Sequence, residues 1–145
     1  PDLKKEFEGS VFYSEWIANK NARASHCLIL APIGTLSRLY HYATITYVGG
    51  GFGDDGLHKI LEAAVYGKPV IFGPEFDKNF EAEELIECGG AISVENAIEL
   101  EKVVDGLLNS KDELSSRSKA AKNYVYKNAG ATDKIISFIK MESLL

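Results

Sequence analysis

Residues 47–74, YVGGGFGDDGLHKILEAAVYGKPVIFGP, combine a glycine-rich turn with an apolar segment that carries one histidine and one glutamate. The turn holds five glycines in eight residues, the first three being Gly49, Gly50 and Gly51. Because glycine lacks a Cβ and accepts positive φ, an anionic group can approach the backbone amides of such a turn closely. The turn therefore predicts a phosphate site. The alternative is that its glycines only allow a strand and a helix to pack tightly.

The segment behind the turn is predicted to be a helix over residues 56–66, beginning near Gly56. Unpaired N–H groups and the positive end of the helix dipole would favour a phosphate at that start. His58 and Glu62 are four residues apart and would share one face of the helix. His58 can donate a hydrogen bond to a phosphate oxygen, and Glu62 can accept hydrogen bonds from two vicinal hydroxyls, as on a ribose. Singly, such residues are more often capping or solvated side chains, so the prediction depends on their joint placement.

A competing interpretation is a dinucleotide site, because Gly51-x-Gly53-x-x-Gly56 matches that fingerprint, with Glu75 about 20 residues further on. Two aspartates at 54–55 oppose it, since they would repel a pyrophosphate. The turn also follows about the third strand, whereas the fingerprint normally opens its fold. Adjacent carboxylates without a third ligand predict no metal site. No Ser–His–Asp or Cys–His arrangement marks a nucleophile.

The elements that would position these residues are predicted from short apolar runs that alternate with helical patterns. Strands are predicted at 10–16, 26–31, 44–50, 68–73 and 91–94, and helices at 34–42, 56–66, 79–88, 96–109, 112–128 and 132–143. Several strands are apolar throughout, as in parallel sheets covered on both faces. This order predicts one α/β domain over residues 1–145 with a doubly wound, mostly parallel sheet. Ligands of such sheets bind beyond the carboxyl ends of the strands, here at loops 31–35, 49–56 and 72–79.

The composition is that of a globular protein, with 145 residues of which 46% are hydrophobic and 26% charged. A formal net charge of -5 argues against a nucleic-acid partner. No apolar run approaches the ~20 residues of a membrane span. Cys27 and Cys88 lack metal-ligand spacing and are interpreted as reduced thiols of a cytosolic protein. The opening residues PDLKKEFEGS contain no entry strand, so we expect the chain to be a segment of a longer protein.

At residues 47–74 the chain resembles the donor-binding half of 3-deoxy-D-manno-octulosonic acid (Kdo) transferases of lipopolysaccharide synthesis. In that family a strand ends in Val-Gly-Gly, a variable loop leads to Gly-x-His-Asn-x-x-Glu, and a Gly-Pro turn follows. The corresponding residues here are Val48-Gly49-Gly50, Gly56-Leu57-His58-Lys59, Glu62 and Gly73-Pro74. The upstream stretch APIGTLSRLYHYATITYVGG and the later NAGAT (128–132) are also similar to the family, so the resemblance covers essentially the whole chain.

The resemblance implies a GT-B glycosyltransferase of two Rossmann-like halves, of which this chain would be the C-terminal, donor-binding one. The implied donor is CMP-Kdo, with no cofactor or catalytic metal. The implied acceptor is a lipid A precursor at the cytoplasmic face of the inner membrane of a Gram-negative bacterium. It would be bound through an N-terminal domain that this chain lacks and that would also supply the general base. We therefore expect no catalytic residue in this chain, which would be a soluble domain, weak in donor binding and inactive alone.

The resemblance also implies roles for individual residues. The amides of Gly49, Gly50 and Gly51, the helix start near Gly56, and His58 would stabilise the charge that grows on the phosphate of departing CMP. Glu62 would hold the ribose, and Lys59, in place of the family's Asn, would add a positive charge. The cytidine would be lined by the backbone of Ile33, Gly34 and Thr35. Ala31-Pro32 replaces the family's Asp-Thr, and Thr35 its Glu.

Two other functions remain open at the level of sequence. One is a different GT-B transferase or epimerase that uses a uridine nucleotide. The other is a non-catalytic module that docks on a partner through an apolar stripe at 135–145, although such a stripe is more often core or packs on a missing half. Asn79 and Phe80 either border the donor sugar or serve as a helix cap and a core residue.

Overall fold

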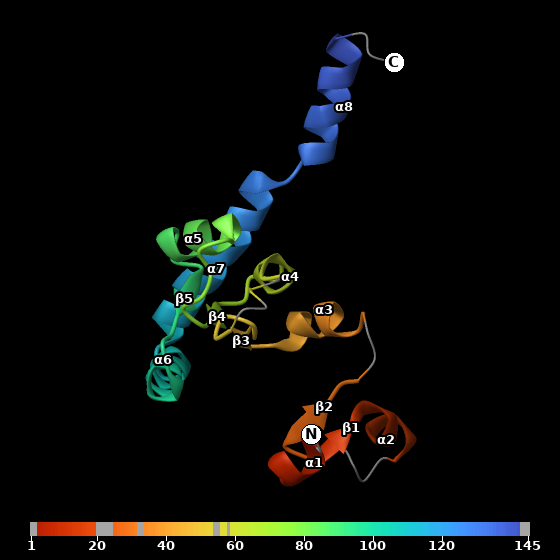
Figure 1. Ribbon diagram of the computed structural model, residues 1–145, viewed down its shortest axis with the longest axis vertical. Coiled ribbons are helices and arrows are strands. Elements are labelled where there is room, and N and C mark those ends of the chain that lie inside the picture. Colours follow the sequence, from red (N-terminus) through yellow and green to blue (C-terminus); the bar gives the residue numbers. More distant parts are fainter. Residues whose placement is uncertain (1–2, 20–24, 32–33, 54–55, 58, 143–145) are drawn as a thin grey trace. The chain divides into compact units, whose positions relative to one another are not determined.

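The computed structural model describes residues 3–19, 25–31, 34–53, 56–57 and 59–142. They form two compact units, residues 1–39 and residues 40–145 (Figure 1). The first contains α1 (Leu3–Glu6), β1 (Ser10–Phe12), α2 (Tyr13–Ala18), β2 (Cys27–Ile29) and α3 (Leu36–Leu39). The second contains the 3₁₀ helix η2 (Tyr40–Tyr42), β3 (Thr46–Tyr47), α4 (Leu61–Ala64), β4 (Val70–Phe72), α5 (Phe80–Glu87), β5 (Ala91–Ser93), α6 (Ala97–Asn109), α7 (Lys111–Asn128) and α8 (Ala131–Met141). A single domain over residues 1–145 stays a prediction.

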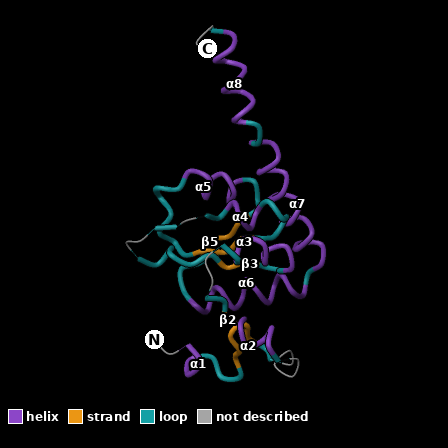
Figure 2. The backbone as a smooth tube through the Cα atoms, turned by 90° about the vertical axis from the view of Figure 1, so that its right-hand side faces the viewer, coloured by secondary structure: helices purple, strands orange, loops and turns teal. Residues whose placement is uncertain are grey.

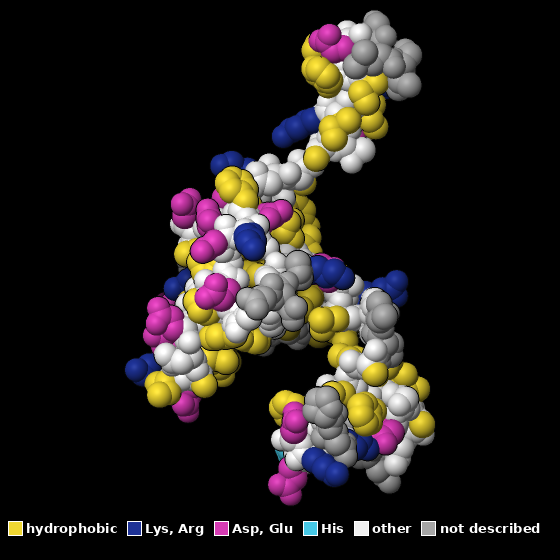
Figure 3. Space-filling model, in the orientation of Figure 1, with side chains coloured by type: hydrophobic (Ala, Val, Ile, Leu, Met, Phe, Trp, Pro, Cys, Tyr) yellow, Lys and Arg dark blue, Asp and Glu magenta, His cyan; other side chains and the backbone are white. Residues whose placement is uncertain are grey.

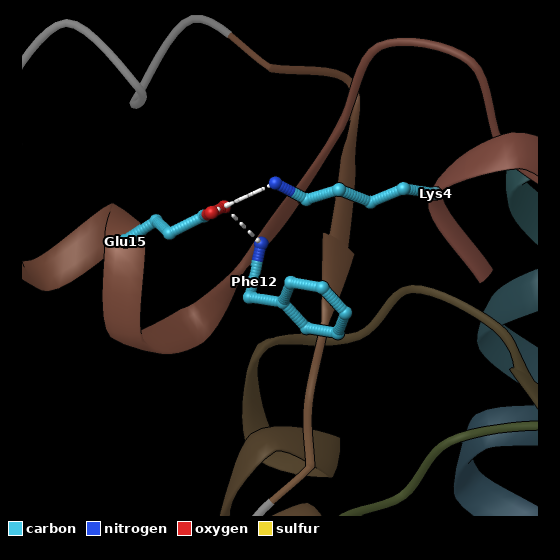
Figure 4. Close-up of polar contacts among 3 residues, drawn as sticks. All are labelled: Lys4, Phe12 and Glu15. Atoms are coloured by element: carbon cyan, nitrogen blue, oxygen red, sulfur yellow. Dashed lines mark hydrogen bonds and ion pairs between the residues drawn. The ribbon is translucent and has the colours of Figure 1, made fainter. Parts of the chain in front are cut away.

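In the first unit, β1 and β2 pair in parallel, with Ser10 opposite Cys27 and Phe12 opposite Ile29. The predicted strand at 10–16 is wrong beyond Phe12, because residues 13–18 form α2. The Glu15 carboxylate accepts a hydrogen bond of 3.1 Å from the Phe12 amide, which satisfies a donor at the start of this helix (Figure 4). Lys4 Nζ lies 2.7 and 2.8 Å from the two oxygens of the same carboxylate. The hydrogen bond from Lys4, and then the one from Phe12, lower the pKa of Glu15.

The second unit is built on the parallel sheet β3–β4–β5. All the residues of its middle strand β4 are buried. Because the side chains of a strand alternate between the faces, β4 is covered on both faces. Val70 and Phe72 pack into a core with residues of α4, α5 and α7, whereas Ile71 packs with α6 residues such as Leu107. Figure 2 shows these strands between α4 and α5 on one side and α6 on the other. The predicted parallel sheet with helices on both faces is therefore confirmed in this unit.

Helix starts follow the capping residues. The side chains of Asn79, Asn96 and Ser110 accept hydrogen bonds from the backbone of the first turns of α5, α6 and α7. The interpretation of Asn79 as a helix cap is confirmed. Helix α8 begins at Ala131, with Gly130 at φ 91° as its N-cap. Glycine is needed there, since a side chain at that φ would be strained.

Helix α8 carries an apolar stripe that the described residues leave exposed (Figure 3). The side chains of the stripe are Ile135, Ile136, Phe138 and Met141. The interpretation of this stripe as core is therefore wrong for the described residues, and its packing on a missing half stays a prediction. No helix among the described residues has the length and apolarity that a membrane crossing requires.

Candidate functional site

Two of the three consecutive glycines have a packing reason. Gly50 adopts φ 98°, and a Cβ there would overlap the carbonyl oxygen of Gly56. Gly51 is buried, and a Cβ there would lie 2.8 Å from the backbone nitrogen of Gly73. The Gly51 carbonyl also accepts a hydrogen bond of 2.9 Å from the Glu75 amide. The alternative of tight packing therefore accounts for Gly50 and Gly51 without any ligand.

Gly49 has a different environment. It is exposed, its φ lies outside the left-handed region, and a Cβ there would meet no other atom within 4 Å. Gly53, on the same turn, shares these properties. Neither glycine is required by packing against the described residues. The turn thus has an open side at Gly49, directly after the buried Val48 at the carboxyl end of β3, which is where ligands of parallel sheets bind.

The prediction that a helix begins near Gly56 is wrong. Helix α4 begins at Leu61 with Ile60 as its N-cap, and spans only four residues. Gly56 at φ 72° and Lys59 at φ 61° are both in the left-handed region, which a right-handed helix cannot contain. Among the described residues, no helix therefore begins at Gly56 and points its dipole there. An anion at this turn would therefore be bound by backbone amides and nearby charged side chains, without help from a helix dipole.

The segment before α4, of which residues 56–57 and 59–60 are described, is called the bend below. Lys59 lies on this bend and Glu62 on α4, both in the second unit. Lys59 is exposed, and its carbonyl accepts a hydrogen bond of 3.1 Å from the Glu62 amide. Glu62 is half-buried near the phenol of Tyr40 in η2. Burial and, second, the negative charge of Glu62 raise the pKa of Tyr40 above its ordinary value. Tyr40 is thus a neutral neighbour of the Glu62 carboxylate that the sequence did not single out.

The other predicted site residues are distributed differently. Ile33 and His58, like the aspartates at 54–55, lie outside the described residues. Gly34, exposed at φ 85°, and Thr35, half-buried, belong to the first unit. Gly49, Gly50, Gly51, Gly56, Lys59 and Glu62 all belong to the second unit, where Gly50 lies against Gly56. That the first set meets the second around one ligand stays a prediction.

Asn79 is a further residue that contacts this bend. Its Nδ2 donates a hydrogen bond of 3.0 Å to the carbonyl of Leu57, while its Oδ1 accepts one of 3.1 Å from the Ala82 amide. An asparagine before a helical pattern predicts the second bond, but nothing in the local sequence indicates the first, which spans 22 residues. The interpretation of Phe80 as a core residue is wrong, because it is 67% exposed.

A separate hollow lies between α5 and α7. It measures about 690 Å³ and contains none of the predicted site residues. The residues lining it are Glu84, Glu87, Cys88, Ser116, Lys119, Ala120, Asn123, Tyr124, Lys127 and Asn128. Among the described residues, no group of three or more His, Cys, Asp or Glu could hold a metal ion.

Comparison with known proteins gives a consistent set of relatives. A 3-deoxy-D-manno-octulosonic acid transferase of Rickettsia typhi is 31% identical over 115 residues, covering 77% of this chain and 25% of that protein. The transferase of the same name from Chlamydophila psittaci is 28% identical over 134 residues, covering 91% of this chain and 30% of that protein. The chain therefore spans between a quarter and a third of the length of these curated relatives. No family model matches the chain.

A solved structure carries the comparison of the fold. The crystal structure of the C-terminal CMP-Kdo binding domain of WaaA from Acinetobacter baumannii superposes with a TM-score of 0.69 at 20% sequence identity. The match covers 80% of this chain and 60% of that one. The fold is that of a Rossmann-like half of a GT-B glycosyltransferase. By its sequence relatives, the chain belongs to the Kdo transferase family.

Proposed function

We propose that the intact protein containing this chain transfers Kdo from CMP-Kdo to a lipid A precursor, and that this chain binds the donor. The observation that carries the proposal is the relation to proteins named as Kdo transferases, at 31% identity over 115 residues. The fold match to a domain described as CMP-Kdo binding agrees with it. The open side of the turn at Gly49 is where we expect the donor phosphate.

The chemistry of donor binding follows from this placement. When the glycosidic bond breaks, negative charge grows on the phosphate of CMP, and preorganised N–H dipoles and cations stabilise that charge. The amides of the turn from Gly49, together with Lys59 and His58, supply these groups. Glu62 accepts hydrogen bonds from the ribose hydroxyls. The backbone of residues 33–35 lines the cytidine.

The remaining parts of the reaction belong to the rest of the intact protein. The acceptor lipid A precursor binds to an N-terminal domain outside this chain, and a carboxylate there deprotonates the acceptor hydroxyl. The donor is the only small molecule required, with no metal. The site of action is the cytoplasmic side of the bacterial inner membrane, where the intact protein is held through its other half.

Calorimetric titration of the intact protein with CMP, UMP and NAD tests this proposal. CMP is expected to bind more tightly than UMP or NAD. Tighter binding of UMP would instead support a uridine-dependent GT-B enzyme, tighter binding of NAD a dinucleotide site, and binding of none a docking module. Each of these three results would overturn the proposal.

Variants at the turn locate the phosphate. Gly49→Ala is expected to weaken CMP binding at least tenfold, because the new methyl group would occupy the open side of the turn. Gly53→Ala is the matched control, since it adds the same group on the same turn where no packing opposes it. Glu62→Gln and His58→Ala are each expected to weaken donor use by more than threefold. If both stay below that limit, which corresponds to less than about 1 kcal/mol, the roles assigned to them are wrong.

A further inference from the structure

Asn79 stands at a junction between two segments that are far apart in sequence. Its Oδ1 caps α5 by accepting from Ala82 N at 3.1 Å, and its Nδ2 donates to the Leu57 carbonyl at 3.0 Å. Leu57 is 4% exposed and belongs to the core, so its peptide group is fixed by its own side chain and by Asn79. One side chain therefore joins the start of α5 to the bend that precedes α4.

The choice of asparagine indicates which of these two bonds requires it. Asparagine, aspartate and serine cap helices about equally well, because the cap needs only an acceptor. The described residues include Asn96 and Ser110 as caps of α6 and α7, each with only a cap bond from its side chain. At position 79 the carbonyl of Leu57 also needs a donor, which aspartate cannot supply and serine is too short to provide at the same time. The amide at this position is thus explained by the bend rather than by the helix.

The bend itself needs support, because it contains strain. Lys59 adopts φ 61°, a conformation that costs a non-glycine residue free energy and persists only where neighbouring contacts fix it. Asn79 holds the chain two residues before Lys59, and the bond from the Glu62 amide to the Lys59 carbonyl, 3.1 Å long, holds it afterwards. Both side chains that we expect at the donor, Lys59 and Glu62, follow this support directly in sequence.

We propose that Asn79 is a positioning residue for the donor site, acting through the carbonyl of Leu57 to set the bend that presents Lys59 and Glu62. The proposal rests on the proposed function, because it assigns the bend to donor binding. Asn79 itself has no contact with the donor in this role. Loss of its Nδ2 donor leaves the α5 cap in place and frees the bend.

Two variants of the intact protein separate the bend from the cap. Asn79→Asp and Asn79→Ser both keep an acceptor for Ala82 N and remove the donor to Leu57 O, and the serine variant adds no charge near a phosphate. Both are expected to weaken CMP binding by at least fivefold in calorimetry and to raise the KM for CMP-Kdo more than they lower kcat. Asn96→Asp is the matched control, since it changes a cap that has no second bond, and is expected to stay within twofold.

Amide hydrogen exchange on the same variants gives a readout independent of activity. Glu62 and Ala63 are expected to exchange at least tenfold faster in both Asn79 variants, while Ala82 and Glu83 of α5 stay within threefold. Equal acceleration in α5 and α4 would show that Asn79 is only a helix cap and would overturn the inference. Normal CMP binding by both variants would overturn it while leaving the proposed function intact. Absence of CMP binding by the unchanged protein would overturn the proposed function, and the inference with it.

Discussion

Lys59 has a strained backbone at the place where we propose that it adds a positive charge for the donor phosphate. Its φ of 61° lies in the left-handed region, which asparagine and glycine adopt more readily than lysine. Lys59→Gly and Lys59→Asn are each expected to raise the free energy of unfolding by about 0.5–1 kcal/mol, since they relieve this strain. Urea unfolding measures the change. Lys59→Ala removes the same charge but keeps the strain, so a gain of the same size in that variant would contradict the explanation.

The glycines of the turn differ in what an added methyl group would do. In Gly51→Ala the Cβ would lie 2.8 Å from Gly73 N, between two buried backbone segments, and overpacking of this kind costs about 1–3 kcal/mol. Gly49→Ala meets no atom within 4 Å and is expected to change the free energy of unfolding by less than about 0.5 kcal/mol. Chemical denaturation of the two variants checks the difference. Equal destabilisation would mean that Gly49 is also a packing residue.

The sequence predicts a glycine-rich turn that the structure contains, but it does not tell which glycines are needed for packing within the chain. Clustered glycines indicate a close approach to the backbone, yet they do not tell whether the approaching atoms belong to a ligand or to the chain, as Gly51 and Gly73 do here. The left-handed conformation of Lys59 had no local signal, because lysine rarely adopts it. The bond from Asn79 to Leu57 depends on tertiary structure, which no local pattern records.

At the scale of elements, a hydrogen bond between α5 and α7 is expected to make the stability of the second unit depend on pH in the alkaline range. The Tyr124 hydroxyl donates a hydrogen bond of 2.5 Å to the Glu84 carboxylate. Burial, and then this bond and the charge of Glu84, raise the pKa of Tyr124 above its ordinary value of 10.0. The folded protein thus holds this proton more tightly than the unfolded chain does.

The sign of the pH dependence follows from that difference. The stabilisation from Tyr124 is complete below the unfolded pKa of 10.0 and falls as the pH rises above it, because the unfolded chain then loses the proton first. Thermal melts between pH 8 and about pH 11 should show a steeper decline for the unchanged protein than for Tyr124→Phe. Tyr126→Phe is the control, since Tyr126 is an exposed tyrosine on the same helix. If the melting temperatures of the unchanged protein and of Tyr124→Phe declined in parallel with pH, the Tyr124–Glu84 hydrogen bond would not be the cause of the pH dependence.

The elements also show why some were predictable and others were not. Strand β4 and the long helices α6 and α7 were predicted because buried apolar runs and helical periods persist there. The segment 13–16 contains Tyr and Trp, which favour strands, but the Glu15 carboxylate stabilises a helix start that this preference did not reveal. The prediction of a helix from Gly56 was wrong because Gly56 and Lys59 are left-handed, so that α4 begins only at Leu61.

At the scale of the whole molecule, the proposed function divides the reaction between this chain and the rest of the intact protein. The chain spans 25% of the Rickettsia typhi relative, and its fold matches that of the C-terminal domain of WaaA from Acinetobacter baumannii. In a GT-B enzyme the donor half and the acceptor half contribute different groups to one reaction. The Kdo transferase relation therefore predicts separate outcomes for binding and for transfer when the chain is taken alone.

Residues 1–145 alone are expected to bind CMP weakly and to transfer no Kdo. We expect binding to depend on the turn, Lys59 and Glu62, which lie within the second unit, and deprotonation of the acceptor to depend on a carboxylate that we place outside the chain. Calorimetry with CMP and a radiolabelled Kdo-transfer assay measure the two quantities, with the intact protein as the positive control in both. CMP binding without transfer supports the division of labour. Measurable transfer by residues 1–145 would show that the chain contains its own base, and the assignment of catalysis to the other half would then be wrong.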